Sequence, residues 1–257
     1  MTRLVCFMAT VALLAATTSV QADSILQLDF GGPGGLGTYA GNNAPAGITQ
    51  TVWNEVLTNQ TNPAGGFVFA DGSAATGVTV ETGRGGGAID WTVPIDRGRA
   101  NDALGTGDGT LGIYDTALTG DWFFGVNQNI GVRVSGLAPG EYDVYSINRE
   151  PTEPGRTYDV GVGVANTTDF TGLAVTSLTG QATNATAFVD GHNFATERVT
   201  VTSTTDFITV IVDPTNDRFA TISGLQIVAV PQPVPEPSSF AVILGLGVAG
   251  LTRRKRS

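Results

Sequence analysis

Reactive and metal-binding side chains are scarce in this chain of 257 residues. It has one cysteine, Cys6, one histidine, His192, and one lysine, Lys255. If Cys6 is removed with a signal peptide, the mature protein has no disulfide, no thiol nucleophile and no cysteine metal site. A single histidine excludes His-cluster metal sites. A Ser-His-Asp triad would have to use His192 as its base, and no G-x-S-x-G segment accompanies it.

Positive charge and helical periodicity are also sparse. Between residues 23 and 234, eight arginines stand against 22 acidic residues, which leaves a net charge near −14. A surface of this sign repels nucleic acid and anionic membranes, so no nucleic-acid partner is expected. Between the two ends of the chain, no stretch of 10 to 12 residues has apolar positions at helical spacing, which disfavours βαβ units.

The first 22 residues have the pattern of a secretory signal peptide. Arg3 supplies the positive start, residues 4–16 form an apolar run, and Val20-Gln21-Ala22 is a small-residue cleavage site. Cleavage between Ala22 and Asp23 would release the mature chain. We therefore expect an exported protein.

The tail, residues 231–257, combines three features in a fixed order. Pro235-Glu236-Pro237 is a stiff, extended strip. The apolar run at 240–251 follows, and as a helix it would be only ~18 Å long, short of the ~30 Å hydrocarbon core of a membrane. The basic cluster Arg253, Arg254, Lys255 and Arg256 should remain on the cytoplasmic side. We expect a single short transmembrane helix that serves as a transient membrane stop.

This tail resembles that of the bacterial PEP-CTERM proteins over residues 235–257. In that family the tail is recognised and cut by a membrane enzyme called exosortase. The resemblance implies that Pro235, Glu236 and Pro237 form the sorting motif and that an exosortase-type enzyme is a partner. It also implies an intermediate at the inner membrane and a final location at the cell surface or in the extracellular matrix. An ordinary short tail anchor with a proline-rich stem is the alternative.

The central part, residues 23–230, predicts an all-β domain, an antiparallel, jelly-roll-like β-sandwich. Short segments rich in Val, Ile, Thr and aromatic residues are separated by turn residues. We expect the segments 130–135 and 141–148 to pair as a hairpin and 96–109 to form a loop. The other predicted strands are 24–30, 51–57, 66–70, 76–82, 88–93, 121–124, 156–164, 173–178, 185–189, 197–203, 207–212 and 221–230.

A second resemblance covers roughly residues 132–230. VRVSGLAPGEYDVYSI, TYDVGVG and TISGLQIVAV look like segments of the jelly-roll sandwiches of the galactose-binding-like superfamily. This resemblance implies a sandwich with a ligand site in its loops. It assigns no individual sugar-binding residue.

Three sets of side chains are candidates for ligand binding. Trp53, Trp91 and Trp122 present flat faces on which sugar rings can stack, although large aromatic residues in a small sandwich commonly pack in the core. A structural Ca²⁺ is the one cofactor that the composition suggests, because a glycine-rich segment carries Asp102, Asp108, Asp115 and Asp121. Two carboxylates ~5–10 Å apart could hydrolyse glycosides, with Glu55, Glu81, Glu141, Glu150, Glu153 and Glu197 available.

The expected function is that of an exported, non-catalytic protein of the cell surface or extracellular matrix. It would be sorted through its tail and associate with exopolysaccharide. Two alternatives remain open at this point. The domain could be purely structural in the envelope or biofilm, or it could be a secreted polysaccharide-acting enzyme with paired carboxylates.

Overall fold

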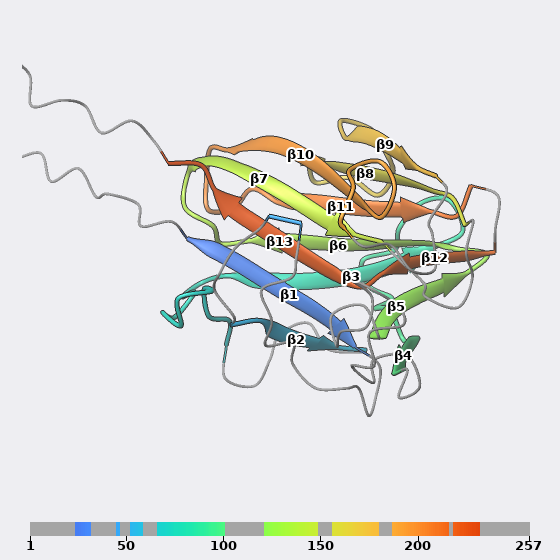
Figure 1. Cartoon of the computed structure of the whole chain (residues 1–257), viewed down its shortest axis with the longest axis horizontal. Helices are drawn as coiled ribbons and strands as arrows, with labels where there is room; N and C mark the ends of the chain where they lie inside the picture. The colour runs from blue at the N-terminus through green and yellow to red at the C-terminus, as the bar shows by residue number, and fades with distance from the viewer. Residues whose placement is uncertain are drawn as a thin grey trace, which may run out of the picture. The chain divides into compact units, whose positions relative to one another are not determined.

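The computed structural model describes residues 24–31, 45–46, 52–58, 66–100, 121–148, 156–179, 187–215 and 218–231 (Figure 1). The strands lie in one compact unit, Asp23–Val230. Across these ranges no helix is long and apolar enough to cross a membrane. The predicted signal peptide and the predicted apolar helix at 240–251 lie outside the described residues.

Two five-stranded sheets form a sandwich (Figure 1). The first sheet has the order β10 (Phe194–Val201), β7 (Gly140–Ile147), β13 (Gly224–Ala229), β1 (Ile25–Gly31) and β2 (Asn54–Leu57). The second sheet has the order β3 (Thr79–Gly85), β6 (Asn129–Ser135), β11 (Ile208–Asp213), β8 (Tyr158–Val164) and β9 (Ala174–Leu178). A smaller sheet has the order β12 (Phe219–Ile222), β5 (Asp121–Val126) and β4 (Gly98–Ala100).

The hydrophobic core lies between the two large sheets. Alternate residues of each strand point to the same face, so every second side chain of a strand can enter the core. The second sheet contributes Val80, Ile130, Val132, Val134, Val160, Val162, Ile208, Val210 and Val212 to one buried cluster. The first sheet contributes Leu26, Leu28, Phe30, Val144, Leu225, Ile227 and Ala229 to the same cluster. The predicted all-β sandwich is confirmed.

The pairing is antiparallel except between β1 and β2, which run parallel. Predicted strands correspond to β1, β2, β3, β5, β6, β7, β8, β9, β10 and β11, with shifts of a few residues at their ends. The predicted strand at 221–230 is interrupted at Ser223, so that β12 and β13 belong to different sheets. Gly98–Ala100 forms the short strand β4 inside the predicted loop 96–109.

Three predicted strands are wrong in their described parts. Residues 66–70 form only an isolated bridge between Val68 and Ala74, and residues 187–189 form no strand. Residues 88–93 form a turn, with one bridge between Arg84 and Asp90. This turn has a local cause. The Asp90 carboxylate accepts hydrogen bonds from both the backbone nitrogen and the hydroxyl of Thr92, and these bonds bend the chain.

The predicted hairpin between 130–135 and 141–148 is also wrong. Both strands form, but β6 pairs with β3 and β11, whereas β7 pairs with β10 and β13. The connecting segment, residues 136–139, is therefore an arch from one sheet to the other. Gly136 has φ +85° and its backbone nitrogen donates to the carbonyl of Thr204, while Leu137 is buried in the core. Burial of Leu137 holds the chain between the sheets and prevents the direct return of a hairpin.

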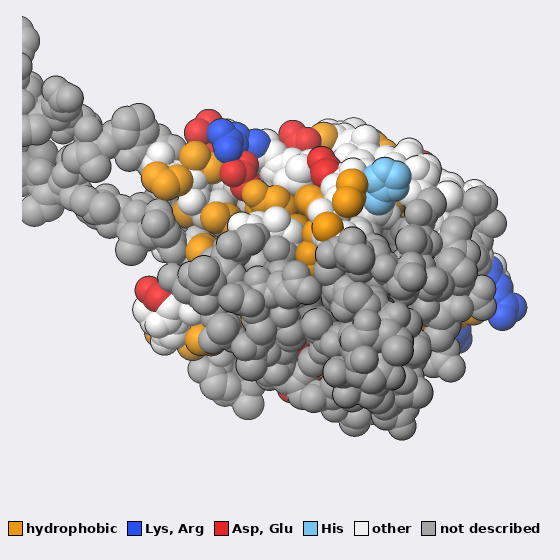
Figure 2. Space-filling model, viewed as in Figure 1, with side chains coloured by type: hydrophobic (Ala, Val, Ile, Leu, Met, Phe, Trp, Pro, Cys, Tyr) orange, Lys and Arg blue, Asp and Glu red, His pale blue; other side chains and the backbone are white. Residues whose placement is uncertain are grey.

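Charged and hydrophobic side chains adjoin on one face of the molecule (Figure 2). The guanidinium of Arg198 on β10 donates to both carboxylate oxygens of Asp143 on β7, at 2.7 and 2.9 Å. A second buried cluster, separate from the sandwich core, consists of Trp53, Ile147 and Phe194, with Tyr145 and Phe188 packed against it. Both features lie on the outer side of the first sheet.

Candidate functional site

Two Asp-aromatic-Thr turns lie over the outer face of the second sheet. In Asp90-Trp91-Thr92, hydrogen bonds from the side chain and the backbone of Thr92 lower the pKa of Asp90. In Asp169-Phe170-Thr171, hydrogen bonds from Thr171 and then from Thr167 lower the pKa of Asp169 in the same way. Both carboxylates therefore stay ionised at neutral pH and hold an aromatic residue at the middle of a turn.

Glycines in the sheet make room for these two aromatic rings. Gly131, Ile211 and Gly161 are neighbours in one row across β6, β11 and β8. A Cβ atom at Gly131 would lie 2.7 Å from Cη2 of Trp91, and one at Gly161 would lie 2.6 Å from Cδ1 of Phe170. A side chain at either glycine would therefore displace a ring from the sheet.

The two turns are also joined to each other. Nε1 of Trp91 donates to the carbonyl of Thr167 at 2.9 Å, and the backbone nitrogen of Ile89 donates to the carbonyl of Thr168 at 2.6 Å. The segment around Trp91 is thereby fixed to the β8–β9 connection. This link shapes the surface from which the site is built.

The Arg133 side chain of β6 lies against two aromatic rings. Its Cζ atom is 4.5 Å from the ring centroid of Trp91 and 4.5 Å from that of Phe207. Nε and Nη2 donate to Oε2 of Glu81, and Nη1 donates to Oδ1 of Asn166 at 3.0 Å. All three nitrogens have acceptors, and the Glu81 carboxylate compensates the positive charge. The arrangement combines cation–π contacts with charge-assisted hydrogen bonds. We call these five residues the arginine clamp.

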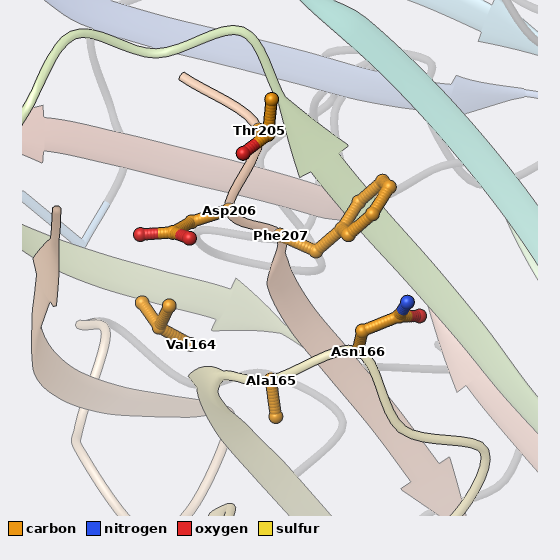
Figure 3. A pocket seen from close by; sticks show the side chains of 6 residues that line it. All are labelled: Val164, Ala165, Asn166, Thr205, Asp206 and Phe207. Atoms are coloured by element: carbon orange, nitrogen blue, oxygen red, sulfur yellow. The ribbon is translucent and has the colours of Figure 1, made fainter. Parts of the chain in front are cut away.

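A small pocket of about 180 Å³ adjoins the arginine clamp. It is formed where β8 ends and where the β10–β11 turn approaches it, and Asn166 and Phe207 belong both to the pocket and to the clamp. Figure 3 shows Val164 and Asp206 to one side, and Asn166 and Phe207 to the other. The complete lining is Val164, Ala165, Asn166, Thr205, Asp206 and Phe207.

Hydrogen bonds fix the orientation of two polar side chains of the lining. Oδ2 of Asp206 accepts bonds from the backbone nitrogen and hydroxyl of Thr202 and from the backbone nitrogen of Ser203, at 2.8–2.9 Å. These bonds lower the pKa of Asp206, so the carboxylate stays ionised. They leave Oδ1 of Asp206 as an acceptor. Arg133 occupies Oδ1 of Asn166, which leaves the amide nitrogen as a donor.

The three tryptophans predicted as sugar platforms lie apart. Trp53, 4% exposed, packs with Ile147 and Phe194 on the first sheet, and Trp122, 1% exposed, lies in β5 of the small sheet. Both rings are buried, so neither offers a face to a ligand from solvent in this conformation. Trp91 is half-buried and belongs to the arginine clamp.

Several other predicted residues lie outside the described part of the chain. They are Ala22 and Asp23, the candidate Ca²⁺ ligands Asp102, Asp108 and Asp115, and the tail residues Pro235, Glu236, Pro237, Arg253, Arg254, Lys255 and Arg256. Asp121 begins β5, and its side chain is not described. Among the side chains that the structure describes, no three His, Asp or Glu residues are grouped to hold a metal ion. Of the candidate glutamates, Glu81 is bound by Arg133.

Sequence reasoning missed Arg133, Asn166, Asp206 and Phe207. One signal was present, because Asp-aromatic-Thr occurs twice, at 90–92 and at 169–171. In each case an aspartate two residues before a threonine predicts a turn. The middle aromatic residue is then a candidate for packing on a sheet face.

Comparisons with known proteins bear chiefly on the tail. Residues 233–256 match the family described as the PEP-CTERM protein-sorting motif. Among curated proteins, no sequence matches the chain.

Two solved structures show distant likeness. Protein YXIM from Bacillus subtilis has 16% identity and a TM-score of 0.39, over 82% of this chain and 42% of its own. An exo-β-1,3-galactanase from Phanerochaete chrysosporium has 9% identity and a TM-score of 0.27, over 42% and 23%. The chain thus spans less than half the length of either protein, and neither likeness bears on its ligand or activity.

The match at residues 233–256 includes the predicted sorting residues Pro235, Glu236 and Pro237, and the basic cluster that follows the apolar run. A PEP-CTERM motif indicates a protein that is exported and processed at the membrane by exosortase. The chain therefore carries the sorting tail of an exported, exosortase-processed protein.

Proposed function

We propose that the protein is a non-catalytic component of the cell surface or extracellular matrix whose β-sandwich associates with exopolysaccharide. The pocket beside the arginine clamp carries this proposal. Its lining combines the aromatic residue Phe207 with the polar residues Asn166, Thr205 and Asp206, and the Asp206 and Phe207 side chains lie on opposite sides of it (Figure 3). Sugar rings have apolar C–H faces and hydroxyl groups that both donate and accept, so they match such a lining.

The state of Asp206 disfavours one of the two carboxylate roles in glycoside hydrolysis, that of the general acid. A glycosidase needs a carboxylic acid whose pKa is raised so that it can protonate the leaving group. Hydrogen bonds from Thr202 and Ser203 lower the pKa of Asp206 instead. The carboxylate of the pocket is therefore an acceptor at neutral pH and not a proton donor.

Sedimentation of the exported protein with exopolysaccharide from the producing cells tests the proposal. We expect the protein in the pellet with the polysaccharide and in the supernatant without it, with no release of reducing sugar. If the protein stays in the supernatant, association with exopolysaccharide is refuted and the purely structural role becomes the favoured alternative. Release of reducing sugar that is lost on a single Glu→Gln substitution would establish an enzyme.

A further inference from the structure

We infer that two copies of this protein pair through the free edge of β9, strand against strand, about a two-fold axis at Val175. This inference goes beyond the proposed function and does not depend on it. Three observations carry it. They are the charge on the outer strands of the sandwich, the direction of the backbone groups of β9, and the exposure of Val175.

Of the four outer strands of the two large sheets, β9 is uncharged. The other three, β2, β3 and β10, contain Glu55, Glu81 and Glu197. The strand β9 has the sequence Ala-Val-Thr-Ser-Leu, with neither charge nor proline, and lies at the margin of the second sheet (Figure 1). Natural sheets use charge, proline or a covering segment to prevent pairing at their edges. A further strand can therefore add to β9 more readily than to the other three.

The register of the second sheet shows which backbone groups of β9 face outwards. The backbone nitrogen of Ala165, which follows β8, donates to the carbonyl of Phe207, so these two residues are a hydrogen-bonded pair. Hydrogen-bonded and non-hydrogen-bonded pairs alternate along an antiparallel ladder. Carried along β8 and across to β9, this alternation turns the N–H and C=O groups of Val175 and Ser177 away from β8.

The open stretch of this edge has two defined ends. The next outward residue, Thr179, confirms the direction, because its backbone nitrogen donates to the carbonyl of Gly191. That bond closes the edge at one end. At the other end, the backbone nitrogen of Leu173 donates to the carbonyl of Phe170 in a turn. Between these two ends, no described residue bonds to the outward backbone groups of β9.

A second copy of the same strand matches this open stretch. With a two-fold axis at Val175, each copy would exchange both outward backbone hydrogen bonds of Val175 with the other. The backbone nitrogen of Ser177 would donate to the outward carbonyl of Leu173 in the second copy. Every contact then occurs twice, as a two-fold interface requires. The Val175 side chain, 51% exposed in one copy, would be covered by its counterpart directly opposite.

The charge of the whole domain favours an uncharged edge as the place where copies meet. Each copy has a net charge near −14 over residues 23–234, so two copies repel each other across most of their surfaces. Pairing at β9 brings no like charges of this strand opposite each other. The contact is short, so we expect a weak, concentration-dependent dimer. Added salt should strengthen the dimer, because it screens the remaining repulsion.

Sedimentation velocity of the exported protein tests the inference. We expect the mass to rise from one chain towards two chains as the protein concentration increases from micromolar to millimolar. The dimer should be tighter at about 500 mM than at about 50 mM NaCl. A dimer held by attraction between opposite charges would respond to salt in the opposite direction.

Val175→Pro is the sharpest variant, because it removes the outward N–H and leaves the bonds between β8 and β9 in place. It removes one hydrogen bond from each copy, so we expect dimerisation to be weaker by about tenfold or more. The melting temperature and circular dichroism should stay close to those of wild type. The matched control is Val175→Thr, which keeps the N–H and the branched shape and should still dimerise.

A second variant keeps the test valid if the proline disturbs folding. Val175→Glu would place two carboxylates opposite each other at the axis and should also weaken the dimer, most strongly at low salt. Its control is Thr200→Glu, which adds the same charge at an exposed position of β10 and should dimerise like wild type.

Three results would overturn the inference. They are the mass of one chain at every concentration, a dimer that neither Val175→Pro nor Val175→Glu weakens, and a mass that grows beyond two chains. The last result would exclude a two-fold contact, which closes with two copies. The proposed function is tested separately, because sedimentation with exopolysaccharide does not depend on the dimer.

Discussion

The hydroxyl group of Tyr142 donates a hydrogen bond to the main-chain carbonyl of Ala138, 2.7 Å away. Tyr142 lies in β7 of the first sheet, and Ala138 lies in the arch that leaves β6 of the second sheet. The tyrosine ring is buried at 2% exposure, beside Leu137 in the same core cluster. The hydrogen bond therefore fixes the arch to the strand that follows it, as tyrosine corners do in other sandwiches.

Tyr142→Phe should destabilise the domain by about 0.5–1.5 kcal/mol, the usual net contribution of one hydrogen bond. The ring and its packing are retained, so the loss is confined to the hydroxyl. Urea unfolding monitored by circular dichroism measures it. Tyr145→Phe is the matched control on the same strand, where the half-buried hydroxyl makes no hydrogen bond to a described residue. Equal midpoints for the two variants would contradict the role of the arch bond.

Gly131→Ala should destabilise the domain by about 1–3 kcal/mol, the range for overpacking. The added methyl group would lie 2.7 Å from Trp91 and push the ring off the sheet. Thermal unfolding measures the effect. Gly86→Ala should be neutral or slightly stabilising, because nothing lies within 4 Å of its added Cβ.

A double-mutant cycle with Trp91→Ala separates this clash from a general preference for glycine. In the Trp91→Ala background, Gly131→Ala should cost much less, since the ring it would strike is gone. Additive effects of the two substitutions would show that the ring and the glycine do not depend on each other.

The arch after β6 and the turn at residues 88–93 show what the sequence alone does not predict. Alternation of apolar residues correctly predicts β6 and β7, because the period of two is a local property of each strand. The alternation does not decide whether residues 136–139 form a hairpin turn or an arch between sheets. The same turn residues can begin either connection. The difference depends on the contact of Leu137 with a core assembled from distant strands. Similarly, residues 88–93 have strand-like composition, yet the bonds from Thr92 to Asp90 make them a turn.

Acid should destabilise the domain partly through Asp206. The pKa of this carboxyl is lowered in the folded state from an unfolded value of about 3.9. The stability that it contributes is therefore present above the unfolded pKa and is lost as the pH falls through the folded pKa. The melting temperature should therefore fall as the pH is lowered below about 5.

Asp206→Asn should be less stable than wild type at pH 7 and should lose less on acidification, because it lacks the titrating group. Thr202→Val, which removes one donor to this carboxylate, should show a smaller change in the same direction. Melting curves at matched ionic strength across this pH range measure both. Identical pH dependence in wild type and Asp206→Asn would refute the assignment.

Replacement of Pro235, Glu236 and Pro237 by alanine should leave the full-length precursor in the membrane. The residues form the stiff strip at the start of the matched sorting motif, ahead of the apolar run. Cell fractionation followed by immunoblotting measures the result. Pro231→Ala, which lies before the matched residues, is the control and should mature normally. Normal maturation of the triple variant would contradict the sorting role.

The tail and the pocket differ in how far sequence predicts them. The tail is predictable because its signal is a linear order of proline, apolar and basic residues, read without a fold. The pocket joins Asn166 to Asp206, forty residues apart, through the pairing of β8 with β11. Its donor becomes oriented only because Arg133 from a third strand occupies the amide oxygen. No local pattern contains that information.

The place of β13 in the first sheet has a mechanical consequence. This last strand, which leads into the sorting tail, is bonded on both sides, to β1 and to β7. A pull on the domain through its tail would load β13 along its own axis. The two rows of hydrogen bonds would then be sheared together and not opened one after another. Any force transmitted from the tail to the domain would therefore meet a strand that is bonded on both sides.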